Sequence, residues 1–196
     1  LRRRQRQMCI RDSLKGLEKG IAGILEKENV YNFIHIPIQS GSDNVLEHMN
    51  RGYTVKQALK SIEKIRNEDT NFVTDIIVGY PTETEDDFKE TVEVIKYLEP
   101  DMVNVSKFSP RESAPLKMKP LPSNIVARRS RMLSELVRKI GKERAKRFHG
   151  KIMRALCFGD HFRLENYKWA KGKGKKGEIG DVKVVWERGL SAKFFK

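Results

Sequence analysis

The sequence predicts an α/β protein in which a parallel sheet is followed by a long helix and a small β-barrel. Between residues 30 and 108, short β-branched runs alternate with helix-like segments, and this alternation is typical of parallel strands joined by right-handed crossovers. Residues 123–149 have the apolar spacing of one long helix. Residues 150–196 are short, β-prone segments separated by glycines, which favours a small barrel.

The first predicted elements are a helix that begins at Ser13 and a strand over residues 30–38. Apolar residues recur at helical spacing between residues 14 and 25. In the strand, the isoleucines share one parity, and His35 and Gln39 have the other. We therefore expect the isoleucines to lie under helices and His35 and Gln39 to face the lumen of a barrel.

Local capping signals mark the starts of the next helices. Ser42 or Asp43 is expected to cap a short helix. The run T-V-K-Q at 54–57 is a capping box that opens a second helix, and Thr84 with Asp87 starts a third. Strands are predicted on either side of the third helix, over residues 72–78 and 102–108.

The pattern changes beyond residue 110. Prolines at 115, 120 and 122 mark a linker, and Ser123 is expected to cap the long helix. One face of this helix is apolar, and Gly150 closes it. The other face is basic. It carries Arg128, Arg129, Arg131, Arg138, Lys142, Lys146 and Arg147.

The net charge of +14 is unevenly distributed. Residues 1–110 hold 16 Lys and Arg against 18 Asp and Glu, a net charge of −2. Residues 111–196 hold 24 against 8, a net charge of +16. A nearly neutral first half joined to a strongly basic second half indicates that the second half contacts a polyanion. The alternative is a solvated basic surface.

The composition argues against a membrane protein, a secreted protein and a disulfide scaffold. No apolar run approaches the ~18 residues of a membrane helix, and no secretory segment follows the N-terminus. Cys9 and Cys157 have neither disulfide nor metal-ligand spacing. We expect unpaired thiols in a reducing cytoplasm, and no membrane or metal contacts.

Residues 1–13 differ from the rest of the chain. They are basic and have no apolar period, so we expect a non-native stretch that carries no fold information. The alternative is a basic arm that binds nucleic acid.

Polar residues gather after the predicted strands. Gln39, Ser40 and Ser42 place an amide and two hydroxyls just before a helix N-terminus, where donors can meet a carboxylate or a ribose hydroxyl. The alternative is an ordinary cap. Asp75 lies in an apolar strand and needs a partner, so it faces a polar lumen or ties down a loop. Gly79 opens a turn.

The third strand is followed by Arg111, which contacts a phosphate or carboxylate, or forms a surface ion pair. No nucleophile–base pair or carboxylate pair stands out, and the four histidines have no ligand spacing. We therefore predict binding groups and no catalytic residue, so that difficult chemistry must come from a cofactor.

Four motifs in order resemble those of the radical S-adenosylmethionine tRNA methylthiotransferases. They are H-I-P-I-Q-S-G-S-D at 35–43, M-N-R-G-Y-T at 49–54, T-D-I-I-V-G at 74–79 and F-S-P-R at 108–111. The runs at 104–108 and 165–168 are similar to the archaeal and eukaryotic branch, which acts on threonylcarbamoyladenosine next to the tRNA anticodon. The resemblance covers residues ~14–196.

The resemblance implies the C-terminal half of a radical SAM partial (β/α) barrel over 14–149, including a connecting helix, and an RNA-binding barrel of the TRAM type over 150–196. It implies S-adenosylmethionine and two [4Fe–4S] clusters as cofactors, and methylthiolation at C2 of the adenine. No C-x3-C-x2-C motif is present, so we interpret the chain as a C-terminal fragment that is inactive alone. The implied cofactor contacts are Gln39, Ser40, Ser42, Asp75 and Gly79.

The implied partner is the anticodon stem-loop of tRNA, with no DNA. Lysines and arginines neutralise phosphates and discriminate little between RNA sequences. Tyr167 and Trp169 can stack on bases of the anticodon loop. Trp169 is equally well explained as a core residue. The predicted RNA contacts are Arg111, Arg163, Asn166, Tyr167, Lys168, Lys171 and Lys173.

Two departures from the family pattern stand out. Thr82 replaces a usual glycine, and E-S-A-P at 112–115 replaces a usual P-G-T-P. Two other functions stay open at this point. The first is a free-standing RNA-binding module without chemistry, and the second is a methylthiotransferase that acts on isopentenyladenosine or a ribosomal-protein aspartate.

Overall fold

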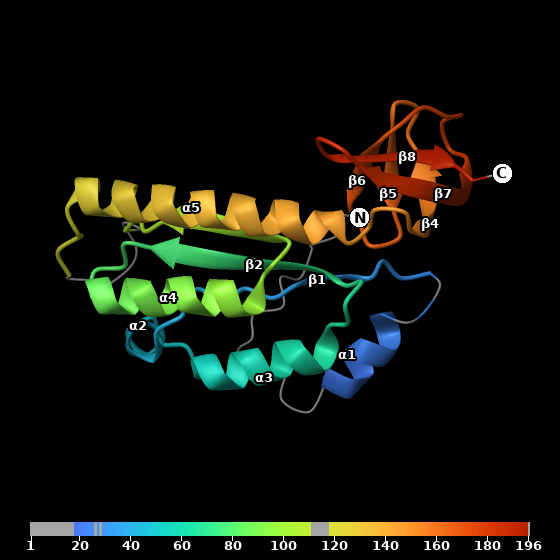
Figure 1. Ribbon diagram of the computed structural model, residues 1–196. Helices are drawn as coiled ribbons and strands as arrows, with labels where there is room; N and C mark the ends of the chain where they lie inside the picture. The colour runs from blue at the N-terminus through green and yellow to red at the C-terminus, as the bar shows by residue number, and fades with distance from the viewer. Residues whose placement is uncertain (1–17, 26, 28, 111–117, 196) are drawn as a thin grey trace, which may run out of the picture.

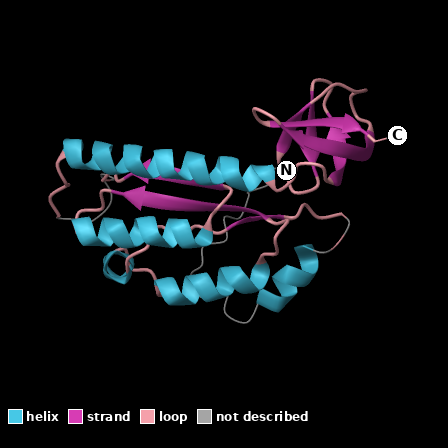
Figure 2. Ribbon diagram, viewed as in Figure 1, coloured by secondary structure: helices cyan, strands magenta, loops and turns pink. Residues whose placement is uncertain are grey.

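The computed structural model describes residues 18–25, 27, 29–110 and 118–195. These residues form a parallel sheet with its helices and a separate small β-barrel (Figure 1, Figure 2). The α/β class and the closed barrel predicted from the sequence are confirmed. Residues 14–17 of the predicted first helix, Arg111 and the stretch 1–13 lie outside the described residues.

The sheet has the strand order β1-β2-β3, and all pairs are parallel. The strands are β1 (Phe33–His35), β2 (Asn71–Val78) and β3 (Met102–Lys107). The helices are α1 (Glu18–Leu25), α2 (Asp43–His48), α3 (Val55–Ile65), α4 (Glu85–Leu98) and α5 (Ser123–Lys146).

β1 is shorter than the predicted strand. Pro37 has no N–H to donate, and the N–H of Ile38 donates to the hydroxyl of Thr74 (3.1 Å) instead of to a carbonyl. Pairing resumes only as a bridge between Gln39 and Ile76. The polar loop after β1 therefore starts while the chain is still attached to β2.

Side-chain parity in the strands matches the prediction. Ile34, Ile36 and Ile38 are buried in the core between the sheet and its helices, as are Phe72 and Ile76 of β2. The residues of opposite parity, His35, Asp75 and Asn104, keep part of their surface exposed. The sheet thus has an apolar face under the helices, and its other face carries these three partly exposed polar side chains.

The predicted capping box at 54–57 is present, and the helix start predicted at Thr84 with Asp87 is also a capping box. Thr54 with Gln57 opens α3, and Thr84 with Asp87 opens α4. Ser42 is the N-cap residue of α2, but its side chain makes no capping hydrogen bond. The position of that helix start was predicted correctly, whereas the role of the hydroxyl was not.

The long helix α5 corrects two expectations. Its N-cap is Pro122, and Ser123 is its first helical residue and makes no side-chain cap. Arg129, assigned to the basic non-core face, is only 3% exposed. It lies four residues before the buried Leu133, so a helix places both on the same inward face.

The closed barrel has the strand order β4-β5-β6-β8-β7. Its core contains Phe148, Phe162, Leu164 and Val184. Within the part of the chain that the structure describes, no helix has the length and apolar character needed to cross a membrane. The barrel strands are β4 (Ile152–Cys157), β5 (His161–Leu164), β6 (Trp169–Lys171), β7 (Ile179–Trp186) and β8 (Leu190–Phe194).

The barrel docks at the amino ends of the sheet strands, at the tail of β2 in Figure 1. Before β1, the N–H of Asn32 donates to the carbonyl of Glu165 (2.9 Å). Before β3, the carboxylate of Asp101 pairs with Lys168 of the barrel (3.0 Å). The polar loops that follow the strands therefore lie at the other end of the sheet.

Candidate functional site

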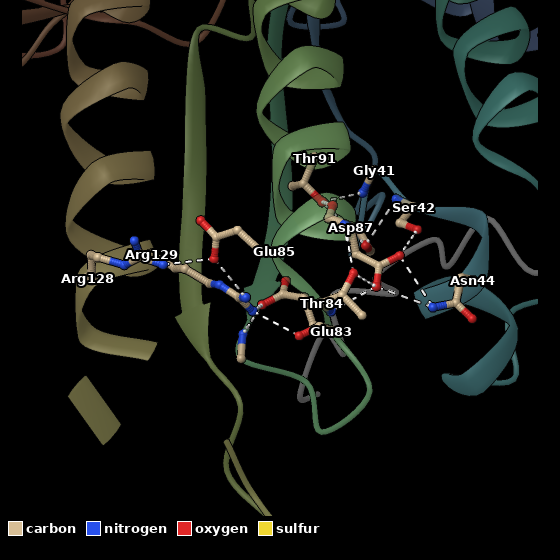
Figure 3. Close-up of polar contacts among 12 residues, drawn as sticks. Gly41, Ser42, Asn44, Glu83, Thr84, Glu85, Asp87, Thr91, Arg128 and Arg129 are labelled. Carbon is tan, nitrogen blue, oxygen red and sulfur yellow. Dashed lines mark hydrogen bonds and ion pairs between the residues drawn. The ribbon is translucent and has the colours of Figure 1, made fainter. Parts of the chain in front are cut away.

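Two loops meet at the carboxyl ends of β1 and β2. They contain residues 39–42 and 79–84, and Figure 3 shows their polar contacts. Gly41 fixes the distance between the first loop and α4, because an added Cβ would lie 2.4 Å from the Cα of Thr91. Its N–H donates to the Thr91 hydroxyl (3.0 Å). Gly41 therefore permits a close approach to α4 within the protein.

Ser40 and Ser42 are each 1% exposed. The hydroxyl of Ser42 donates to Asp87 (2.5 Å), and the hydroxyl of Ser40 accepts from the Ser42 N–H (3.2 Å). Both side chains are thus used inside the protein, where they stabilise the loop.

The carboxylate of Asp87 accepts hydrogen bonds from both loops and so joins them. It accepts from Ser42, from the N–H (2.8 Å) and hydroxyl (2.7 Å) of Thr84, and from Asn44 (3.3 Å). Burial alone would raise the pKa of Asp87, but these hydrogen bonds outweigh it and hold the pKa below its usual value. Asp87 therefore remains a carboxylate that rigidifies the loops.

A buried ion pair supports the second loop from α5 (Figure 3). Arg129 donates to the carboxylate of Glu83 (2.6 Å) and to that of Glu85 (3.1 Å). Gly79 has a φ of +79°, and its N–H donates to Glu83 (2.8 Å). An added Cβ on Gly79 would lie 2.6 Å from a methyl of Val126, so this glycine packs directly under α5.

The face of the sheet opposite the apolar one carries a hydrogen-bonded group. The imidazole of His35 lies 2.8 Å from the carboxylate of Asp75, and the amide of Asn104 donates to the same oxygen (2.7 Å). Asp75 thus has its partners on neighbouring strands, and 22% of its side chain is exposed. Gln39, at φ 74°, is half-buried at the end of this face.

The outside of the barrel carries an arginine between two aromatic rings. The guanidinium carbon of Arg163 lies 3.5 Å from the ring centre of Trp169 and 4.0 Å from that of Tyr167. Trp169 is 45% exposed, so it is a surface residue. Its ring also contacts His161 (4.5 Å) and Phe158 (5.2 Å). Lys171 and Lys173 are exposed nearby on the chain.

Two of the residues predicted to contact RNA lie inside. Asn166 is fully buried, and its side-chain oxygen accepts from the N–H of Lys168 (3.2 Å). The ammonium of Lys168 pairs with the buried Asp101, and burial lowers the pKa of Lys168. Both side chains are thus used inside the protein, so we do not propose them as RNA contacts.

Phe158, His161 and Tyr31 belong to the same aromatic surface but were not predicted. His161 precedes Arg163 by two residues on β5, so strand periodicity could have placed it on the outside. Tyr31 contacts Tyr167 at 5.0 Å from 136 residues earlier in the chain, and no local signal reveals such a contact.

Metal ligands do not gather among the described residues. No group of three or more His, Cys, Asp or Glu side chains there has the arrangement of a metal site. Cys157 is buried in the barrel, and its sulfur accepts from the N–H of Gly159 (3.3 Å). These residues therefore do not fit an iron–sulfur cluster, and Cys9 lies outside them.

Comparisons with known proteins agree with the motifs. Residues 12–95 match the Radical SAM superfamily. A probable threonylcarbamoyladenosine tRNA methylthiotransferase of Archaeoglobus fulgidus is 40% identical over 166 residues, which cover 80% of this chain and 39% of that protein. A protein of the same name from Methanocaldococcus jannaschii is 37% identical, covering 83% and 38%.

A tRNA-2-methylthio-N(6)-dimethylallyladenosine synthase of Aquifex aeolicus is 36% identical over 177 residues, which cover 84% of this chain and 40% of that protein. The chain thus spans about two-fifths of the length of these curated relatives. Residues 12–95 therefore resemble the radical SAM superfamily, and over most of its length the chain is similar to tRNA methylthiotransferases.

Proposed function

We propose that this chain is part of a tRNA methylthiotransferase that adds a methylthio group to C2 of N6-threonylcarbamoyladenosine next to the anticodon. The observation that carries the proposal is the presence, in one chain, of a radical SAM segment and a barrel with an exposed arginine–aromatic surface. The names of the archaeal relatives support the choice of nucleoside.

In this proposal the sheet end with the polar loops holds S-adenosylmethionine. Gln39 and Asp75 border the face opposite the apolar one, while Ser40, Ser42 and Gly79 give the loops their shape. S-adenosylmethionine with iron–sulfur clusters, two in the full-length enzyme, supplies the radical chemistry. The described residues do not fit a cluster, so their part is to bind and orient.

The barrel, which we propose to be of the TRAM type, holds the anticodon stem-loop. Arg163, Tyr167 and Trp169 offer cationic and aromatic surface to unstacked bases. Lys171 and Lys173 are exposed and can neutralise phosphates. Arg111, which follows β3, is retained as a phosphate contact on sequence grounds alone.

The test is the salt dependence of RNA binding. An anticodon stem-loop RNA labelled with fluorescein is titrated with the 196-residue chain at 50 to 200 mM salt, and anisotropy gives the affinity. We expect log K to fall linearly with log salt. Replacing Lys171 and Lys173 with glutamine should reduce the slope by roughly 1.4–1.8, since each phosphate contact contributes about 0.7–0.9.

A matched control is the double variant Lys60→Gln with Lys64→Gln. Both lysines are exposed but lie on α3, which is not part of the barrel, so this variant should keep the wild-type slope. Equal affinity at the two ends of the salt range, or equal slopes for the two double variants, would contradict the proposed RNA surface.

A second candidate substrate is an N6-dimethylallyladenosine, as the name of the Aquifex aeolicus relative indicates for that protein. Mass spectrometry of tRNA nucleosides from cells that lack the gene separates the two. We expect loss of the 2-methylthio form of threonylcarbamoyladenosine only. Loss of the dimethylallyl form instead would replace the first substrate by the second.

A further inference from the structure

A surface groove lies where the barrel meets the segment that leads into β1. Its volume is about 280 Å³, close to the lower limit of about 300 Å³ for ligand pockets, so it suits one small group. Figure 1 shows the segment before β1 running past the barrel. The groove is lined by Asn29, Val30 and Tyr31 of that segment and by Arg154, Ala155, Leu156, Arg163, Glu165 and Ile179 of the barrel.

The groove offers two apolar surfaces for a flat ring. Tyr31 is 43% exposed, and its ring meets that of Tyr167 edge-on at 5.0 Å. Tyr167 in turn contacts Phe33 at 5.0 Å. Phe33 therefore helps to hold Tyr167 in place, and Tyr167 helps to fix the orientation of Tyr31. Ile179 of β7 is 61% exposed. An aromatic side chain held in place next to exposed apolar surface is the usual stacking platform for an unpaired base.

The groove also offers two guanidinium groups. Arg163 is fixed by its contacts with Trp169 and Tyr167 and by a hydrogen bond from its Nη1 to the Tyr167 carbonyl (2.8 Å). The aromatic rings contact the guanidinium group over its carbon, so N–H groups at its edges remain able to bind an anion. The side chain of Arg154 is exposed, and its charge acts on the carboxyl of Glu165 in the same groove. Two such groups suit a phosphate.

Glu165 adds an acceptor to the lining of the groove. Its carboxyl lines the groove, and burial raises its pKa. A carboxylate at this position can accept a hydrogen bond from the exocyclic amino group of a base. The combination of an aromatic ring, two arginines and one acceptor matches the parts of a single nucleotide.

We propose that this groove binds one unstacked nucleotide of the RNA, with its base against Tyr31 and Ile179 and its phosphate between Arg154 and Arg163. The inference rests on the proposed RNA binding and extends it, because Tyr31 belongs to the nearly neutral first half of the chain. The RNA site is then shared by the barrel and the sheet domain, and neither part completes it alone.

The test uses the 196-residue chain and a single-stranded RNA that carries 2-aminopurine at one position in turn. At the position that enters the groove, stacking on Tyr31 should quench 2-aminopurine fluorescence. Tyr31→Ala should remove the quenching and weaken binding about 5- to 150-fold, with the salt slope unchanged. Tyr31→Leu keeps apolar volume against Tyr167 and should show the same loss of quenching if the fold is retained.

Arg154→Gln tests the phosphate contact independently of packing, because this side chain is exposed. It should weaken binding and lower the salt slope by about 0.7–0.9. The matched controls are Tyr97→Ala, an exposed tyrosine on α4, and Lys64→Gln on α3, which should both bind like the wild type.

The outcomes separate this inference from the proposed function. If the wild type binds RNA and Trp169→Ala weakens binding, but the Tyr31 and Arg154 variants bind and quench like the wild type, the groove is not a nucleotide site while the RNA surface stands. If the wild type binds no RNA at any salt concentration, both fail.

Discussion

Replacement of Asp101 by asparagine is expected to destabilise the junction between the barrel and the sheet. The side chain of Asp101 is fully buried. Arg147 donates to it with both terminal nitrogens (2.8 and 3.1 Å), Lys168 lies at 3.0 Å and the Nε of Arg144 at 3.6 Å. The carboxylate also accepts from the N–H of Phe72 at the start of β2 (3.0 Å). Asp101→Asn therefore leaves three cations without their common counter-ion.

The expected cost is about 3–5 kcal/mol, the usual range when one partner of a buried ion pair is removed. For a chain of this size, 1 kcal/mol shifts the Tm by roughly 2–4 °C, so Asp101→Asn should lower the Tm by roughly 6–20 °C. Circular dichroism melts at pH 7 measure this shift. Asp86→Asn is the control, because Asp86 pairs with Lys89 on the surface with 86% of its side chain exposed, and such pairs contribute little.

The pH dependence of the folding stability tests the contacts of Asp101 a second time. Burial alone would raise the pKa of Asp101, but the hydrogen bonds from Arg147 and the charge of Lys168 hold the pKa below its usual value. A carboxyl with a lowered folded-state pKa contributes stability that is present above its unfolded pKa, about 3.9, and is lost as the pH falls through the folded value. The difference between wild type and Asp101→Asn should thus be full at pH 7 and shrink below about pH 4. A Tm for Asp101→Asn equal to that of Asp86→Asn at pH 7 would refute the reasoning.

Two further changes test the loops at the other end of the sheet. Gly41→Ala should lower the free energy of unfolding by about 1–3 kcal/mol, because the added methyl overpacks against α4. Gly20→Ala should raise it by about 0.5–1 kcal/mol, because Gly20 has open space around it in α1. Urea unfolding of both variants checks that the two effects have opposite signs. Arg129→Met should cost about 3–5 kcal/mol because Glu83 loses its buried partner, while Arg128→Met on the exposed face of the same helix should cost less than about 1 kcal/mol. Similar unfolding midpoints for the two arginine variants would show that the buried pair does not support the loop.

The parts of the fold that depend on local sequence were predictable. The capping boxes at Thr54 and Thr84 involve residues three positions apart, so both helix starts follow from neighbouring residues. Strand parity likewise placed Ile34 and Ile36 in the core and His35 outside it. Each of these features is decided by side chains within a few positions of one another.

The features that sequence reasoning missed depend on partners far along the chain. Arg129 is buried because Glu83 lies opposite it, 46 residues away. Lys168 turns inward because Asp101 offers a buried charge 67 residues earlier. A lysine or arginine in a basic run looks exposed on average, and only the tertiary position of one carboxylate decides otherwise.

The docking of the barrel at the amino ends of the strands fixes a spacing within the molecule. The eight residues of β2, at about 3.3 Å each, separate the barrel junction from the polar loops by roughly 25 Å. In the proposed function, an RNA bound at the barrel therefore extends along the length of the sheet to present a nucleotide at the far rim. In that function, the length of this scaffold limits which nucleotide along a bound RNA can reach the far rim.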